Sequence, residues 1–160
     1  MTKRRVVFLA ALLLASLLTS RPSRILGADD RKKALDAVQT TEKFLADALA
    51  GRNKEAAALG EPGKAYSREE KIKEVGELGV KKLALVRVLA DDQAALAITE
   101  QVVEPKRHQK GSLQIRLIKK DKHWLIRDVD FGAVQEERNL KRFQREHPKA
   151  KEIEIPKKDK

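Results

Sequence analysis

The acidic side chains offer the clearest candidates for chemistry in this sequence. Asp128 follows Trp124 and Ile126 in a segment where apolar and polar residues alternate. Our predicted strand register places Asp128 opposite Leu113 on an apolar inner face, and a carboxylate in apolar surroundings can serve as a general base. The structural alternative is that Asp128 ends its strand or forms an ion pair with Arg87 or another arginine.

Other polar and aromatic side chains could share a pocket with this carboxylate. Arg87 and Glu100 lie in the two preceding apolar segments, while Trp124 and Tyr66 are the only tryptophan and the only tyrosine. We expect Tyr66 to pack with its hydroxyl in water rather than to stabilise an oxyanion. The candidate ligand-binding residues are therefore Arg87, Glu100, Trp124, Asp128 and Tyr66, and no residue is assigned a catalytic role.

Metal and cofactor chemistry has little support in the sequence. The three histidines, His108, His123 and His147, are far apart and form no i, i+4 pair, so we expect surface histidines, no metal site and no cofactor. The chain has no cysteine, which excludes disulfides, thiolate ligands and a cysteine nucleophile. It also lacks a glycine-rich phosphate loop and a nucleophile elbow.

The net charge of +11 is concentrated at the two ends of the chain. Residues 1–27 hold five Lys and Arg and no acid, residues 28–137 hold 21 against 20 acids, and residues 138–160 hold nine against four. An almost neutral central domain argues against nucleic-acid binding, which needs clustered cations on a folded surface. The basic C-terminal tail suggests weak contact with an anionic lipid surface, although a solvated tail is the alternative.

The N-terminus has the pattern of a secretory signal peptide. Lys3, Arg4 and Arg5 precede the apolar run from Val6 to Leu18, which is short for a membrane span. We expect residues 1–27 to be a signal peptide and the protein to be periplasmic or extracellular. A retained membrane anchor is the alternative, because no clean small-x-small cleavage site follows the run.

Three helices are predicted after the leader. The first runs from Asp29 to about Ala50 and ends at Gly51, because apolar residues recur at helical spacing. A short second helix follows with Asn53 as its cap. Residues 67–70 fit a capping box, with Ser67 as the cap of a third helix that ends at Gly79.

Two β-hairpins are predicted next. Residues 80–90 and 93–104 flank Asp91 and Asp92, and Leu83, Leu85, Arg87 and Leu89 would share a face with Ala94, Leu96, Ile98 and Glu100. A polar link, residues 106–110, leads to the second hairpin, residues 111–131, whose turn we place at Lys120 and Asp121. Antiparallel pairing then sets Leu117 opposite Trp124, Ile115 opposite Ile126 and Leu113 opposite Asp128 on the core face.

The predicted domain spans residues 28–132. Residues 133–160 are expected to form a basic C-terminal helix and a flexible tail, with little order from Lys149 onward. Ile153 and Ile155 alternate with Glu152 and Glu154, so an added edge strand is the alternative for this segment.

The order of these elements resembles the nuclear-transport-factor-two-like superfamily, which includes the ketosteroid-isomerase-like and SnoaL-like proteins. The likeness rests on a charged turn before Trp124 and Ile126, and on the pattern around Phe44, Leu45 and Leu49 before Gly51. It implies an α+β cone in which a curved antiparallel sheet of about four strands packs against about three helices and leaves a cavity. Relatives are often dimers through the open sheet, so the likeness also implies a homodimer.

Two classes of function follow from the sequence. The first is an exported, non-catalytic domain that binds a small apolar or amphipathic ligand, or a protein partner. The second is a cavity enzyme, an isomerase, cyclase or hydrolase, with Asp128 as its general base. The first class is preferred.

Overall fold

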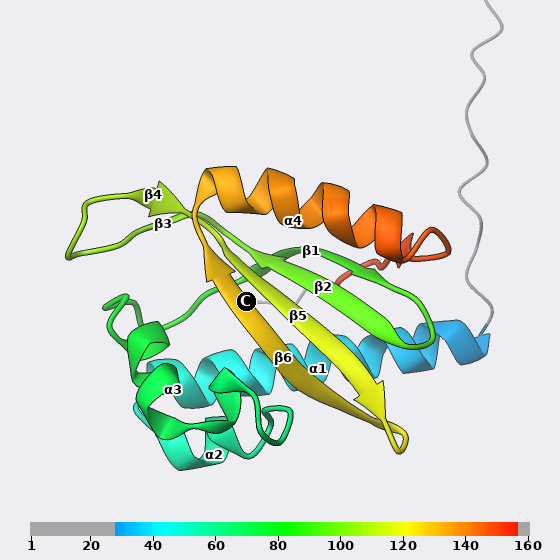
Figure 1. The fold of residues 1–160 in the computed structure, drawn as a ribbon, viewed down its shortest axis with the longest axis horizontal. Helices are drawn as coiled ribbons and strands as arrows, with labels where there is room; N and C mark the ends of the chain where they lie inside the picture. Colours follow the sequence, from blue (N-terminus) through cyan, green and yellow to red (C-terminus); the bar gives the residue numbers. More distant parts are fainter. Residues whose placement is uncertain (1–27, 157–160) are drawn as a thin grey trace, which may run out of the picture.

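The computed structural model describes residues 28–156 and combines four α-helices with a five-stranded antiparallel sheet (Figure 1). The predicted signal peptide, residues 1–27, lies outside the described residues, as do residues 157–160. In chain order the elements are α1 (Ala28–Leu49), α2 (Asn53–Ala57), the 3-10 turn η1 (Ala65–Ser67), α3 (Glu69–Gly76), β1 (Leu85–Ala90), β2 (Ala94–Thr99), β3 (Val102–Val103), β4 (Lys110–Gly111), β5 (Leu113–Lys120), β6 (His123–Phe131), α4 (Ala133–Glu146) and β7 (Lys151–Glu152).

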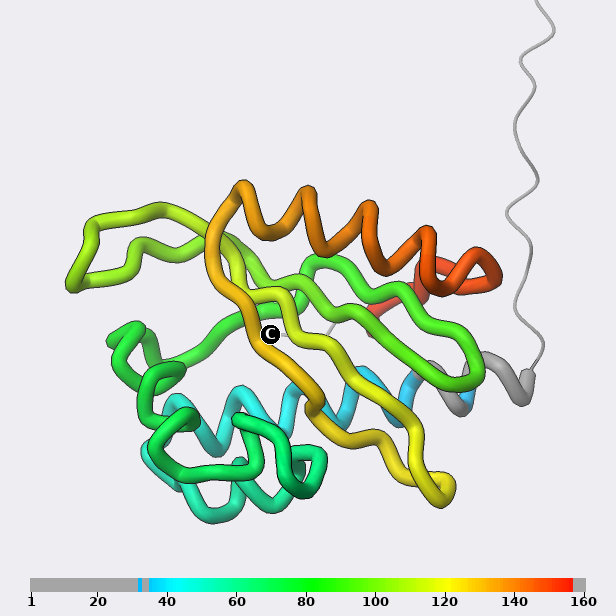
Figure 2. Tube along the Cα trace, viewed as in Figure 1, coloured from blue at the N-terminus to red at the C-terminus, as the bar shows by residue number. Residues whose placement is uncertain are grey.

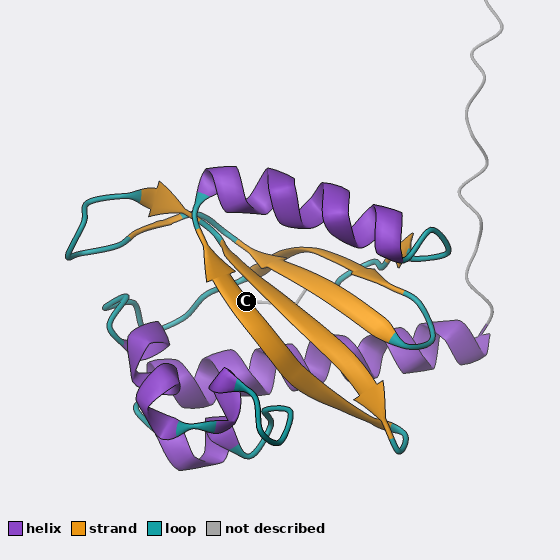
Figure 3. Cartoon of the chain, in the orientation of Figure 1, coloured by secondary structure: helices purple, strands orange, loops and turns teal. Residues whose placement is uncertain are grey.

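The sheet lies between two helical layers (Figure 3). Its strand order is β6-β5-β2-β1-β7, with β3 and β4 as a separate two-stranded ribbon. The first three helices cover one face and bury the main core, which includes Phe44, Leu45, Ile115 and Ile126. Helix α4 covers the other face, where Phe143 packs on a smaller apolar cluster from β1 and β2. The predicted α+β class with an antiparallel sheet is confirmed, with five strands in place of about four.

Helix α1 forms where the apolar spacing predicted it. Val38, Leu45 and Ala48 recur on one side and are buried against the sheet and the other helices. The chain leaves the helix through Gly51, whose positive φ of 74° suits a residue without a side chain. Asp47, buried near this end, accepts hydrogen bonds from Lys43 at 2.7 Å and Arg52 at 2.8 Å.

The two predicted helix caps are wrong. Arg52 and Arg68 occupy the cap positions of α2 and α3, and neither side chain caps its helix by a hydrogen bond to the first-turn amides. Asn53 is already the first residue of α2. The Ser67 hydroxyl donates to the Lys64 carbonyl oxygen at 2.8 Å, because η1 brings these residues together before α3 starts.

The β1–β2 hairpin turns at the predicted place. The Asp91 amide donates to the Ala94 carbonyl at 3.0 Å, and the Asp91 carboxylate accepts the amides of Gln93 and Ala94 at 2.8 Å. Leu89, Ala94, Leu96 and Ile98 share the face under α4, as predicted. A register irregularity between Leu85 and Arg87 moves Leu83 and Leu85 to the main core, so that part of the predicted face is wrong.

The β5–β6 hairpin differs from its predicted register. Its two-residue turn is Asp121 and Lys122, both at positive φ (49° and 70°), so Leu117 pairs with Ile126 rather than with Trp124. A shift of two residues preserves the faces, and Leu117, Trp124 and Ile126 are in the core as expected.

A second irregularity in this hairpin changes a face. The register shifts between Arg116 and Leu117, which leaves Arg127 as an extra residue in β6. Asp128 then pairs with Arg116 on the α4 side, while Val129 enters the main core. The prediction that Asp128 lies on the inner face is therefore wrong.

The outer edge of β6 is covered by the segment that follows α2. The Ile126 amide donates to the Leu59 carbonyl and the Glu61 amide donates to the Ile126 carbonyl, each at 2.8 Å. Between them, Gly60 leaves no room for a side chain, because an added Cβ would lie 2.2 Å from the Tyr66 carbonyl oxygen. This contact occupies the backbone of β6 at Ile126 and interrupts the edge to which a strand of another chain could pair.

The C-terminal segment is more ordered than predicted. Residues 149–156 were expected to have little order, but β7 pairs with Leu89 and Ala90 of β1 and places Ile153 in the main core. Figure 2 traces this segment from the end of α4 back to the sheet. The alternation of Ile153 and Ile155 with charged residues therefore marked an edge strand, a short one.

Candidate binding cleft

A cleft opens between α3, the β3–β4 ribbon and the end of β6. Figure 1 shows these three elements on its left side. Its volume is about 740 Å³. The apolar part of its lining comes from three parts of the chain, and consists of Tyr66, Val75, Leu78, Leu113, Val129 and Phe131. These residues belong to the main core or pack against it, so the cleft is an open extension of that core.

The rim of the cleft is charged and largely self-neutralised. Lys71 pairs with Glu74 at 2.7 Å along α3, and Lys106 of the ribbon pairs with Glu77 at 2.6 Å. The Glu77 carboxylate raises the pKa of Lys106 above its ordinary value through this hydrogen bond. The second pair links the tip of the ribbon to the end of α3 and holds the two walls of the cleft together.

Tyr66 is the one predicted binding residue that lines the cleft. Its hydroxyl donates to the Val129 carbonyl oxygen at 2.8 Å, and its ring meets Phe44 edge to face at 6.5 Å. Burial, reinforced by the charges of Asp128 and Glu74, raises the pKa of the Tyr66 hydroxyl far above its usual value. Tyr66 therefore stays neutral and fixes the wall of the cleft, which differs from the predicted wet hydroxyl.

The structure does not bring the predicted binding residues together. Arg87 pairs with Glu152 of β7 at 2.9 Å on the far edge of the sheet. Glu100 accepts a hydrogen bond from the Ala84 amide at 2.8 Å, and it is exposed. Trp124 is buried near the β5–β6 turn, where Lys119 Nζ lies 5.4 Å from the centre of its ring. None of these three residues lines the cleft.

Asp128 lies on the α4 side of the sheet and has two partners. Its carboxylate accepts a hydrogen bond from Arg116 Nη2 at 2.6 Å and one from the Val129 amide at 3.1 Å. Asp128 therefore forms an ion pair with an arginine directly after the bulge. This agrees with the structural alternative predicted from the sequence, and the arginine is Arg116 rather than Arg87.

A polar network is buried where α4 begins. Gln114 Nε2 donates to the Ser112 and Gly132 carbonyls at 2.7 Å and 3.2 Å, and Ser112 Oγ bonds Glu136. Asn139 joins the network by donating to Gln114 Oε1 at 3.4 Å, and it also donates to Asp130 at 2.8 Å. Its members bond one another, which explains how these polar residues are accommodated between the sheet and α4.

The sequence does not predict the ribbon residues that line the cleft, because the polar pattern of residues 106–110 indicates only a link between two hairpins. Glu104, Lys106, Arg107 and Gln109 line the cleft from the loop between β3 and β4. Their signal was the short Val102–Val103 pair before the link and the Lys110–Gly111 pair after it, which form the ribbon. The residues on α3 needed the tertiary fold to be found.

Residues 28–156 contain neither a cluster of metal-ligand side chains nor a membrane-spanning helix. In this range no group of three or more histidine, aspartate and glutamate side chains is arranged to hold a metal ion. His147 Nδ1 instead lies 2.8 Å from Asp91 Oδ2, and its ring stacks on Phe143. Nor does any helix of this range have the length and apolar character needed to cross a membrane.

Comparisons with known proteins identify no relative of this chain. No family model matches it, and neither the curated proteins nor the solved structures include a match. The likeness to the nuclear-transport-factor-two-like superfamily remains a prediction that rests on the residues quoted for it.

Proposed function

We propose that this protein is an exported, non-catalytic binding domain with a cone-like fold, and that its cleft takes a small amphipathic ligand. The observation that carries the proposal is an open cleft of about 740 Å³ whose exposed lining is mostly polar and charged, above a floor of largely buried apolar side chains. Sites for small molecules have volumes of about 300–1,000 Å³, and the volume of this cleft falls in that range. Its largely polar lining favours a ligand with polar groups as well as an apolar part. Export is proposed from the signal-like sequence of residues 1–27.

The same geometry speaks against the cavity enzyme with Asp128 as its base. A general base must reach the proton that it removes, within about 3 Å or through one water. Asp128 instead bonds Arg116 and the Val129 amide on the α4 side of the sheet. The acids that do line the cleft include Glu74 and Glu77, which are held in exposed ion pairs.

Nuclear magnetic resonance can test the proposed site with an amphipathic probe. We expect 1-anilinonaphthalene-8-sulfonate to shift amide signals of α3, the β3–β4 ribbon and the end of β6. Gln109→Trp, at the mouth of the cleft, should weaken this binding about tenfold by filling the entrance. Gln144→Trp, on the exposed side of α4, is the matched control and should leave it unchanged.

Two outcomes would count against the proposed site. Probe-induced shifts confined to α4 or to the β5–β6 turn would place binding elsewhere, and equal effects of the two tryptophan variants would show that the cleft is not used. Native mass spectrometry of the protein from an exporting host then shows whether a natural ligand is retained.

A further inference from the structure

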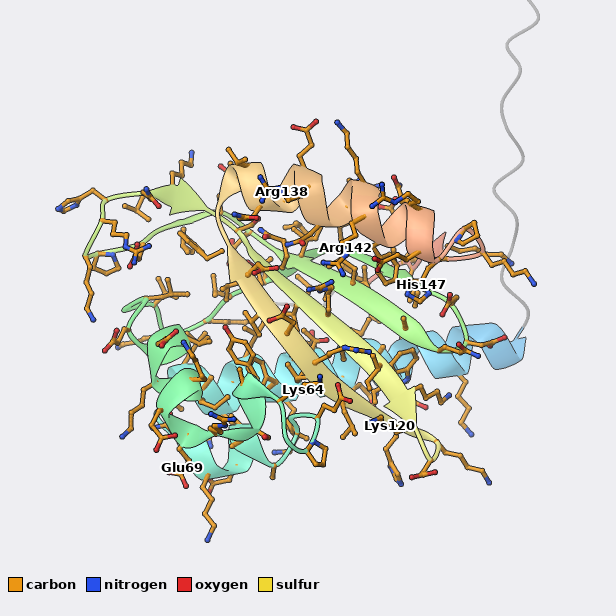
Figure 4. The ribbon with its side chains drawn as sticks, viewed as in Figure 1. Lys64, Glu69, Lys120, Arg138, Arg142 and His147 are labelled. Atoms are coloured by element: carbon orange, nitrogen blue, oxygen red, sulfur yellow. The ribbon has the colours of Figure 1, made fainter. Side chains whose placement is uncertain are left out.

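A compact group of basic side chains surrounds the tip of the β5–β6 hairpin, away from the cleft. We call it the basic patch and define it as Lys64, Lys119, Lys120, Lys122, His123 and Arg127. Lys120 pairs with His123 across the hairpin, and Lys64 and Lys120 lie on the same side of the molecule (Figure 4). Asp121 and Glu61 are the acids at this place, so five Lys and Arg against two acids give a net charge of +3.

Glu61 holds part of this patch in position. Its carboxylate is almost fully buried, with Lys120 Nζ at 2.8 Å and Arg127 Nε at 3.7 Å. Oε2 of Glu61 makes no hydrogen bond within the described structure. Lys120 and Arg127 remain about half exposed, so the buried acid anchors cations that still face water. Fixed cations lose less conformational entropy when they meet an anionic surface.

The composition of the patch favours a diffuse anionic surface over a specific protein site. Four of its five permanent cations are lysines, and lysine is a hydrated point charge without the fork that binds carboxylates in two places. Lysine is also depleted in protein–protein interfaces, whereas arginine is enriched. A headgroup layer of anionic lipid needs only positive charge near its surface.

The ends of the chain are poor occupants of this surface. Residues 1–27 hold five Lys and Arg with no acid, and residues 157–160 hold three lysines with one aspartate. Like charges repel, so neither end is attracted to the patch. The described residues 28–156 hold 27 Lys and Arg against 23 acids, a net charge of +4, and the patch accounts for +3 of it.

We propose that the basic patch is a docking surface for the headgroups of an anionic phospholipid bilayer. This contact is independent of the cleft and is made by a folded hairpin. Contact through the basic C-terminal segment is a separate surface and stays a prediction: residues 133–156 pack on the sheet, but Arg138 and Arg145 of α4 are exposed. Lys64, Lys120 and Lys122 would face the bilayer together with Arg127, while Lys119 lies over the Trp124 ring and adds its charge from the other face of β5.

Vesicle sedimentation tests this proposal with the form of the protein that accumulates in an exporting host. The readout is the difference in binding between vesicles of phosphatidylglycerol with phosphatidylcholine and vesicles of phosphatidylcholine alone. Binding through an apolar segment, which is equal for the two kinds of vesicle, is removed by this subtraction. Lys64→Gln with Lys122→Gln should reduce this difference about tenfold or more at low salt, since each basic residue near an anionic surface contributes to binding. Arg138→Gln with Arg145→Gln on α4 removes the same charge and should have little effect.

Each possible result either supports or overturns the proposed lipid contact. Binding that depends on the anionic lipid, fades at high salt and is lost only in the Lys64 and Lys122 variant supports the patch. Equal losses in the two double variants would show that only total charge matters. Absence of a lipid difference in the wild-type protein, or tighter binding to polyglutamate than to the vesicles, would overturn the proposal.

Discussion

At the scale of single residues, Asp128 has two hydrogen-bond donors as partners. Its carboxylate accepts hydrogen bonds from Arg116 Nη2 and from the Val129 amide. Arg116 Nε is buried and makes no hydrogen bond in the described structure. The aspartate thus compensates a partly buried cation at the point where β6 carries its extra residue. Removing one charge of such a pair leaves the other charge poorly solvated.

We expect Asp128→Asn to lower the free energy of unfolding by about 1–2 kcal/mol, less than for a fully buried pair because Asp128 is partly exposed. Chemical denaturation measures this loss, and Glu55→Gln on the exposed side of α2 is the control. Binding of the cleft probe should be unaffected. An unchanged stability together with impaired probe binding would assign Asp128 to the site after all.

Asp91 makes the stability of the protein depend on pH. Burial alone would raise the pKa of this carboxyl, but the amides of Gln93 and Ala94 and the ring of His147 together hold it below its ordinary value. A carboxyl with a lowered pKa in the folded state stabilises the protein above its unfolded pKa of about 4, and this contribution is lost as pH falls through the folded value.

We therefore expect wild-type protein to be more stable than Asp91→Asn at pH 7, with a gap that closes as the pH falls below about 4. Urea denaturation from pH 7 to pH 3 measures both proteins. Other carboxyls with a lowered pKa, such as Asp47 and Glu61, are present in both and cancel in the difference. A gap that stays constant over this range would contradict the role given to Asp91.

At the scale of elements, the β5–β6 hairpin turns through a lysine in a conformation that favours glycine. Lys122 has φ of 70° and follows Asp121 at 49°, and positive φ at both central residues is the mark of a type I′ turn. Residues other than glycine, asparagine and aspartate are disfavoured at positive φ. The sequence Asp-Gly is the usual solution.

Lys122→Gly should raise the free energy of unfolding by about 0.5–1 kcal/mol, because glycine relieves the strain at positive φ. Lys122→Ala removes the same positive charge while keeping a Cβ, and so separates the backbone effect from the charge effect. Thermal and urea denaturation of both variants provide the comparison. If glycine were no more stabilising than alanine, the strain at this turn would be negligible.

At the scale of the whole molecule, the C-terminal segment links the two sides of the sheet. Phe143 belongs to the apolar cluster under α4, and ten residues later Ile153 belongs to the main core with Trp124. Both clusters share the strands β1 and β2. Residues 133–156 are therefore part of the same folding unit as residues 28–132.

We expect Phe143→Ala and Ile153→Ala to destabilise one common transition, by about 3–5 kcal/mol and 2–4 kcal/mol. Trp124 fluorescence reports unfolding of the main core. The midpoint of the transition that it follows should therefore be lower in Phe143→Ala, even though Phe143 lies on the other face of the sheet. Val134→Ala, at an exposed position of α4, should change stability by less than about 0.5 kcal/mol. Two separate transitions would show that α4 is an independent unit.

The sequence predicts the helices and strands of this fold better than it predicts strand register and strand pairing. The apolar spacing of α1 and the alternation in β5 and β6 recover those elements, because burial of one face leaves a repeating pattern. The extra residue at Arg127 leaves no such pattern, and the face of Asp128 was wrong for that reason. Polar composition made an edge strand only the alternative for the C-terminal segment, although Ile153, directly after β7, is buried in the main core.

The candidate site was hardly predictable. Tyr66, one of the predicted binding residues, lines the cleft, but the other lining residues come from α3, the ribbon and the strand ends. They meet only after β6, α3 and the ribbon have packed, and each is an ordinary apolar or charged residue in its own segment. The basic patch was missed because the predicted domain was almost neutral as a whole.

The place of β7 at the edge of the sheet has a consequence for synthesis of the protein on the ribosome. Strand β1 is made early, yet the partner on its open side, Lys151–Glu152, is made after every other strand of the sheet. Until that segment has left the exit tunnel, the backbone of β1 can pair with a strand of a neighbouring nascent chain. Translation that stalls shortly before residue 151 should therefore leave a product that is prone to aggregate, although all its helices have been made.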